Sequence, residues 1–278
     1  MLMAAPPALG QAVPAFIRAR GGVRLTIGGT PAGSAPLAIA EGGGYRVRFP
    51  RGEGCEGVLI NTGGGLAGGD RMTVDARVSD GAAAALTTQA AEKVYRSEDA
   101  DTEIAIRLRL DQGSRLDWLP QEQILFDGAR LARSLDVTMA RDASLFLAES
   151  VVFGRIAMGE TVQDGLFRDR WRIRRDGRLV FAEEVRLAAP IAAGLAGKAA
   201  ADGARALATL LYVAPDAEKR LEGARAILEE ARSESGASAF DGMLIARFLS
   251  PDPKVLRADI VRFVERFRGR AMPRSWQS

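Results

Sequence analysis

The chain of 278 residues has a formal net charge of +3, with 26% charged and 47% hydrophobic residues. This composition is typical of a globular protein with a large core, and no apolar run reaches the ~18 residues that a membrane helix needs. The sequence contains no histidine, which excludes Ser-His-Asp and Cys-His catalysis and any histidine-ligated metal centre.

The N-terminal segment and the single cysteine bear on cellular location. Residues 1–20 contain three prolines and no cationic segment ahead of an apolar one, so we predict an N-terminal tail and no secretory signal. Cys55 cannot form an intramolecular disulfide, which fits a reducing compartment, and we expect a cytoplasmic protein. No basic cluster in the sequence lowers its pKa, which favours an incidental loop cysteine over a reactive thiol. Dispersed arginines with few aromatic residues predict neither nucleic-acid nor membrane binding.

A glycine-rich segment at positions 61–70 (NTGGGLAGGD) contains a formal G-x-G-x-x-G motif. A dinucleotide site requires a helix after this loop, but residues 71–78 alternate apolar and polar at period two and predict a strand. We therefore interpret the glycines as a tight connection between two strands, closed by Asp70. The length of the run also leaves open a close approach of another backbone or a partner.

Residues 23–187 show an almost continuous pattern of β-strands, each ending in a turn led by aspartate. Asp80, Asp111, Asp142 and Asp176 are separated by 31, 31 and 34 residues. A repeat of this length, with two strands per unit, favours stacked β-layers as in a solenoid or β-helix. A β-sandwich with regular hairpins is the competing interpretation.

The last third of the chain changes character. Apolar residues from 217 to 231 recur at helical spacing, and positions 250–253 (SPDP) predict the start of a second helix, which carries an apolar stripe over 256–267. We predict a mainly β protein, β-helix-like, with a small C-terminal α-helical element. The expected parts are a tail (1–20), a β-layered body (21–190) and a helical or mixed portion packed on the body (191–278), together one structural domain.

Four segments follow the glycine loop in a fixed order: 87–97 (TTQAAEKVYRS), 118–129 (WLPQEQILFDGA), 154–160 (GRIAMGE) and 169–171 (DRW). Together with the loop they closely resemble the urease accessory protein D family (UreD, also called UreH). The resemblance covers about residues 57–187 firmly and the C-terminal part more loosely.

The resemblance implies a β-helix-like body and a non-enzymatic role in maturing urease. It implies binding to apo-urease and directly to UreF, which recruits the GTPase UreG, and passage of nickel through an internal channel. Without histidine, this chain offers carboxylate, carbonyl and water ligands, which hold nickel weakly. We therefore expect nickel to pass transiently, with no tightly bound cofactor.

Four carboxylates are candidates for the transient nickel path: Asp70, Glu149, Glu160 and Glu183. Glu149 and Glu183 each lie seven residues after a turn aspartate, so stacked repeats are expected to place them in register. Hydrogen-bonded core or edge carboxylates are the alternative for each. Glu184 is expected to face the opposite side of its strand from Glu183. For five further residues in the matching segments we expect a structural or interface role: Lys93, Tyr95, Arg96, Asp127 and Arg170.

A second class of function is a carbohydrate-active β-helix enzyme that uses carboxylates. Such a site needs two acidic groups roughly 5 to 10 Å apart, and it usually contains aromatic platforms. Only 6% of the residues are aromatic, which disfavours this alternative.

Overall fold

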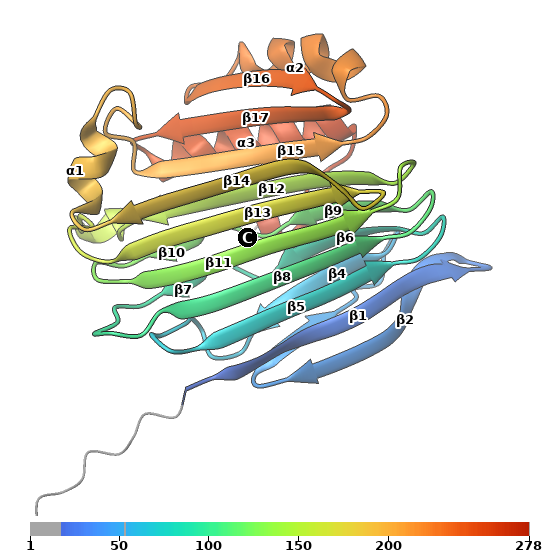
Figure 1. Cartoon of the computed structure of the whole chain (residues 1–278), viewed down its shortest axis with the longest axis horizontal. Helices are drawn as coiled ribbons and strands as arrows, with labels where there is room; N and C mark the ends of the chain where they lie inside the picture. Colours follow the sequence, from blue (N-terminus) through green and yellow to red (C-terminus); the bar gives the residue numbers. More distant parts are fainter. Residues whose placement is uncertain (1–17, 53, 278) are drawn as a thin grey trace, which may run out of the picture.

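Two facing β-sheets form the body of the molecule in a computed structural model that describes residues 18–52 and 54–277 (Figure 1). The seven-stranded sheet has the order β14 (Arg178–Ala188), β13 (Leu166–Arg175), β11 (Arg130–Met139), β8 (Thr102–Leu110), β5 (Arg71–Val78), β1 (Arg20–Thr30) and β2 (Gly33–Gly42). The ten-stranded sheet has the main order β16 (Glu234–Phe240), β17 (Met243–Ser250), β15 (Ala206–Val213), β12 (Ser144–Phe153), β9 (Arg115–Leu119), β6 (Ala83–Thr88), β4 (Glu56–Asn61) and β3 (Tyr45–Arg48), with β7 (Glu92–Val94) and β10 (Gln123–Leu125) paired beside it.

The central strands are coils of a solenoid. The chain runs from β5 through β6 and β7, then repeats the path in β8, β9 and β10, and each strand pairs in parallel with its counterpart one coil later. Leu86 pairs with Trp118 and Glu92 with Gln123, so equivalent positions lie 32 and 31 residues apart. The predicted mainly β, solenoid-like fold is confirmed.

The four turn aspartates are not equivalent. The turns at Asp80, Asp111 and Asp142 carry the chain from the first sheet to the second, whereas β13 and β14 form an antiparallel hairpin within the first sheet. Asp176 and Gly177 have φ values of 49° and 75°, the left-handed pair that a two-residue hairpin requires. The expectation that this turn continues the stacked repeat is therefore wrong.

The glycine loop connects β4 to β5, which confirms the two-strand interpretation. A Cβ atom added at Gly68 would lie 1.9 Å from Ser97 Oγ, and one at Gly65 would lie 2.5 Å from the Tyr95 ring. Asp70 accepts hydrogen bonds from the backbone N–H groups of Ala67 and Ala19, both at 2.8 Å. The glycines are thus needed for close approach to the next coil.

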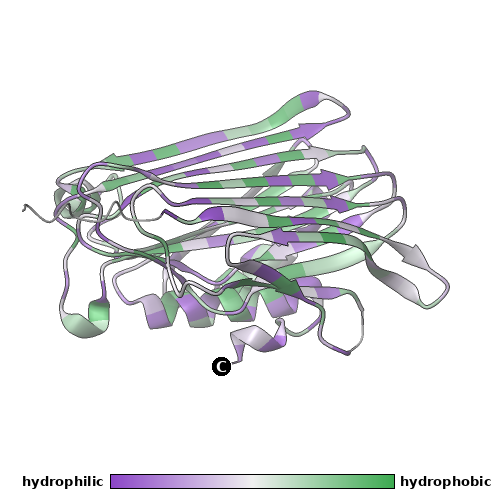
Figure 2. Cartoon of the chain, turned by 90° about the horizontal axis from the view of Figure 1, so that it is seen from below, coloured by the Kyte–Doolittle hydropathy of each residue, from purple (hydrophilic) through white to green (hydrophobic). Residues whose placement is uncertain are grey.

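The main core lies between the two sheets, where apolar residues alternate with polar ones along the strands (Figure 2). A second core lies under α3 (Pro253–Arg268), which packs on β15 and β17. Asp252 caps this helix by accepting the Lys254 N–H at 2.8 Å, and Pro253 is its first residue. The predicted start of the second helix is confirmed.

The predicted helix over 217–231 is shorter than expected: η2 (Glu218–Arg220) leads into α2 (Leu221–Leu228). Asp259 on α3 accepts the N–H groups of Arg232 and Ser233 and the Ser233 hydroxyl, which fixes the chain in an extended path toward β16. The remaining short helices are η1 (Ile156–Met158), α1 (Ile191–Ala196) and η3 (Arg274–Trp276). Most of the predicted tail, residues 1–17, lies outside the described residues. No helix in the described part of the chain is long and apolar enough to cross a membrane.

Replacing Gly68 by alanine tests the packing of the glycine loop. The added methyl group overlaps Ser97, so we expect a loss of about 1–3 kcal/mol of stability, with the thermal midpoint falling by about 2–4 °C per kcal/mol. Gly29→Ala is the matched control, because its added Cβ meets nothing within 4 Å. Equal midpoints for the two variants would contradict the packing argument.

Candidate functional site

A cavity of about 240 Å³ lies between the two sheets, on the side of the body next to α1. Two of the predicted carboxylates, Glu149 of β12 and Glu183 of β14, line this cavity together with Asp169 of β13. Two arginines, Arg133 and Arg247, also line it. The structure therefore brings these acidic residues into one internal space, with cations beside them.

Arg133 holds two of these carboxylates. Its guanidinium donates to Glu149 of the opposite sheet and, through Nε, to Asp169 Oδ1 at 2.8 Å. Trp118 Nε1 donates to Glu149 at 2.7 Å, and Trp171 Nε1 donates to Asp169 at 2.9 Å. The side chains of Arg133, Glu149 and Asp169 are 3%, 2% and 9% exposed, so the network is buried and links the two sheets.

The electrostatics of this network favour an arginine that stays charged. Burial acts to lower the pKa of Arg133, but Asp169 and Glu149 together raise it above its ordinary value. Burial raises the pKa of Glu149, while Arg133 and the Trp118 N–H act in the opposite direction. The two most deeply buried carboxylates of this cavity thus share one guanidinium.

Glu183 forms an ion pair with Arg247 of β17, whose side chain is 55% exposed. Glu149 and Glu183 lie on facing sheets and not in one stacked register, so the predicted register is wrong, because the hairpin at Asp176 keeps β14 in the first sheet. Glu184 points away from the cavity and pairs with Arg168 at 3.0 Å, as expected for its neighbour position.

A second pocket, of about 250 Å³, lies farther along the solenoid near the glycine loop. Glu92 lines it with Asn61 and Tyr45, and Asn61 Nδ2 donates to Glu92 Oε1 at 2.9 Å. The Tyr45 hydroxyl is buried without a hydrogen-bond partner in the described part of the chain, as is Oε1 of Gln123, the residue in register with Glu92. Buried oxygens without a hydrogen-bond partner, lying near a carboxylate, can form hydrogen bonds with a ligand or a water molecule.

Glu92 differs from the other interior carboxylates in having no compensating cation. Burial raises its pKa to about 7, against the hydrogen bond from Asn61, which lowers it. No arginine or lysine in residues 18–52 and 54–277 forms an ion pair with it. Burial also raises the pKa of Tyr45, with Glu92 and Asp70 adding to the effect. Glu92 is therefore a carboxyl group that exchanges a proton near neutral pH.

The other predicted nickel-path residues have internal partners. Asp70 binds two backbone N–H groups of the glycine loop and β1 entry, as described above. Glu160 forms two hydrogen bonds with the Arg155 guanidinium and accepts its backbone N–H at 2.8 Å. The Arg155 pair holds the pKa of Glu160 at about 2. Within the described ranges, no three His, Cys, Asp or Glu side chains converge as a metal site.

The residues expected to be structural or at an interface are distributed over the body. Tyr95 donates its hydroxyl to Gly64 O at 3.0 Å and packs its ring edge-on against Phe126. Lys93 and Arg96, both exposed, flank it on the same segment. Asp127 accepts the N–H groups of Gln163 and Asp164, and Arg170 lies 3.6 Å from Asp136 on the outer sheet face.

Several residues in the two cavities or paired beside them were not predicted from sequence: Arg133, Asp169, Glu92, Asn61 and Gln123. For the last three a signal exists, since they are spaced by 31 residues, the length of one coil. For Arg133 and Asp169 the signal is the alternation of their strands, which places each charged residue on the apolar, inward-facing phase. The lone cysteine is buried, and burial raises the pKa of the Cys55 thiol to about 11, which supports the incidental interpretation.

A family model described as "UreD urease accessory protein" matches residues 19–277. The chain belongs to the UreD family of urease accessory proteins. It is 51% identical over 269 residues to the urease accessory protein UreD of Methylobacterium sp. (strain 4-46), which covers 94% of this chain and 95% of that protein. It is 45% identical over 278 residues to UreD of Rhodopseudomonas palustris (strain HaA2), covering 99% of both chains. Because the relatives are named urease accessory proteins, membership of the UreD family implies an accessory, non-catalytic role.

Replacing Glu92 by glutamine tests its raised pKa. A folded-state pKa of about 7 against 4.5 means that the native protein keeps a proton that the unfolded chain has lost, so stability falls as pH rises from about 4.5 to about 7. We expect Glu92→Gln to remove on the order of 2–3 kcal/mol of this decrease, measured as the difference in unfolding free energy between pH 5 and pH 8. Glu184→Gln, a change on the outer face, is the control, and we expect it to unfold with the same pH dependence as the native chain. An unchanged slope in Glu92→Gln would contradict the raised pKa.

Replacing Arg133 by leucine tests the buried network. The change leaves Glu149 and Asp169 buried without their cation, so we expect a loss of about 3–5 kcal/mol in denaturant unfolding. Arg170→Leu removes an arginine from a partly exposed pair and should cost about 0–1 kcal/mol. Similar losses in the two variants would show that the sheets do not depend on this network.

Proposed function

We propose that the protein is a scaffold for urease maturation and an internal conduit for nickel. In this proposal it binds apo-urease and UreF directly, meets the GTPase UreG through UreF, and passes nickel toward the urease active site. The observation that supports the accessory role most strongly is membership of the UreD family over residues 19–277. The conduit is supported by the two internal cavities that contain carboxylates.

Nickel is the cargo in this proposal, and the donor set suits transient binding. Carboxylate, amide and hydroxyl oxygens bind nickel more weakly than imidazole or thiolate. Glu92, with Asn61 and Tyr45 beside it, offers oxygens of this kind in one pocket. A nickel ion arriving there would replace the proton that the carboxyl group carries near neutral pH. Weak sites of this kind release what they bind, as a conduit must.

The second cavity divides its carboxylates into two groups. Glu149 and Asp169 are held by the buried guanidinium of Arg133, which a divalent ion would have to displace. Glu183 is held by a half-exposed arginine, and ion pairs of that kind contribute little stability. Glu183 is therefore the carboxylate of this cavity that an ion reaches at the lowest cost.

Glu183→Ala is expected to lower the nickel content of urease while the complex with apo-urease and UreF still forms. Nickel is measured per urease active site after co-expression with the accessory proteins. Glu184→Ala is the matched control, because this side chain lies on the same strand but on the outer face. The conduit assignment is overturned if both variants load nickel as the native chain does, or if both lose it equally.

The scaffold is tested by affinity capture with the tagged, full-length chain. We expect purified apo-urease and UreF each to be retained, and UreG to be retained only when UreF is present. Deletion of the gene should abolish nickel-dependent activation of urease. Failure to retain either partner, together with intact activation, would end the proposal.

A further inference from the structure

The outer face of the seven-stranded sheet carries rows of arginine that run across the strands. Parallel in-register pairing places Thr26, Arg77, Arg109, Thr138 and Arg174 side by side on β1, β5, β8, β11 and β13. With neighbouring strands about 4.8 Å apart, this row spans about 19 Å. We name it the arginine row: it contains three cations and no carboxylate.

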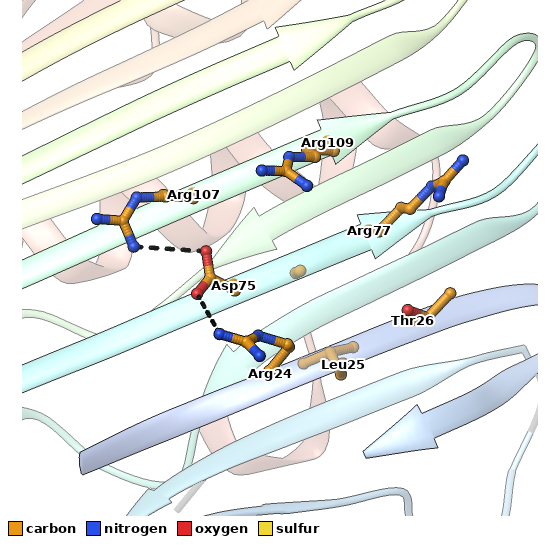
Figure 3. Close-up of a pocket in the computed structure, with 8 residues that line it drawn as sticks. Arg24, Leu25, Thr26, Asp75, Arg77, Arg107 and Arg109 are labelled. Carbon is orange, nitrogen blue, oxygen red and sulfur yellow. Dashed lines mark ion pairs between the residues drawn. The ribbon is translucent and has the colours of Figure 1, made fainter. Parts of the chain in front are cut away.

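The groove beside the arginine row has a volume of about 570 Å³ and lies over β1, β5 and β8. Figure 3 shows Arg77 and Arg109 on adjacent strands, with Arg24 and Arg107 on either side of Asp75. The groove is therefore open to a ligand and dominated by guanidinium groups.

Charge pairing within the chain leaves part of the row unsatisfied. Arg77 binds Asp111 at 2.8 Å, but Arg109 and Arg174 form no ion pair with any described residue. Arg77 and Arg109 occupy directly opposed positions of one ladder, and like charges placed so are unfavourable. Unfavourable contacts of this kind, such as neighbouring like charges, are typical of binding surfaces, where function outweighs their cost in stability.

The neighbouring row decides which kind of partner fits. It alternates in sign across the sheet, with Arg24, Asp75, Arg107, Asp136 and Arg172 in register. Asp75 lies 3.9 Å from Arg24 and 3.6 Å from Arg107. A continuous phosphate backbone would meet these carboxylates, and neither row offers an aromatic side chain for base stacking. A folded protein with a mainly acidic, partly basic surface complements both rows.

We propose that the arginine row is a docking surface for the acidic face of a partner protein. The surface is built on paired strands, so the backbone positions that carry its arginines are fixed before binding. Electrostatic complementarity of this kind raises the association rate and makes binding sensitive to salt. The choice of partners for the test rests on the proposed function.

The test compares Arg109→Glu/Arg174→Glu with Arg51→Glu/Arg115→Glu in the full-length chain. Arg51 and Arg115 are exposed and lie outside the seven-stranded sheet, so the control has the same change in charge. Binding to purified apo-urease and to purified UreF is measured at low and physiological salt. We expect the row variant to bind one of the two partners at least about tenfold more weakly, while the control stays within about twofold.

Equal affinities of the native chain and the row variant for both partners, or equal losses in row variant and control, would overturn the docking surface. If the native chain binds neither partner, the scaffold function itself fails. The arginine row is then tested with poly-L-glutamate. We expect this polymer to bind the native chain, and its affinity for the row variant to be at least about fivefold lower. Binding of a short DNA duplex as tight as that of poly-L-glutamate would also overturn it, because it would favour a nucleic acid.

Discussion

In-register parallel stacking of the coils is the constraint on which the rest of this structure depends. Each residue of β5 to β7 lies beside the residue about 31 positions later in β8 to β10. The repeat length therefore determines which side chains are neighbours in the interior and on both outer faces. The glycine loop belongs to the same constraint, since Gly65 and Gly68 allow one coil to approach Tyr95 and Ser97 of the next.

Stacking separates charges by environment. Inside, the buried carboxylates Glu149 and Asp169 are compensated by Arg133, because an ionised group without a partner there is very costly. On the outer face, arginines form rows, and those without an ion-pair partner remain solvated by water. Glu92 is the exception inside: it has hydrogen-bonding oxygens nearby but no cation, and its pKa of about 7 is the consequence. Such departures from full pairing are where binding is best sought.

The sequence predicts most of the architecture because its signals are local or periodic. Alternation at period two marks the strands, the 31-residue spacing marks the coil, and the SPDP cap marks the start of α3. The turn at Asp176-Gly177 lies 34 residues after Asp142, close to the 31-residue spacing of the coil turns, yet its backbone forms a two-residue hairpin. Spacing alone does not distinguish a turn that crosses between sheets from one that reverses within a sheet.

The candidate site was predicted only in part. Glu149 and Glu183 do share a cavity, but they meet across the two sheets and not along one. Arg133 lies on the apolar phase of its alternating strand, two residues from Leu131 and Leu135, but the alternation does not say which buried carboxylates it contacts. The sequence by itself determined the family, the repeat length and the absence of imidazole ligands. Only the tertiary structure decided which charges are buried together and which remain unpaired, because pairing depends on contacts between strands far apart in the chain.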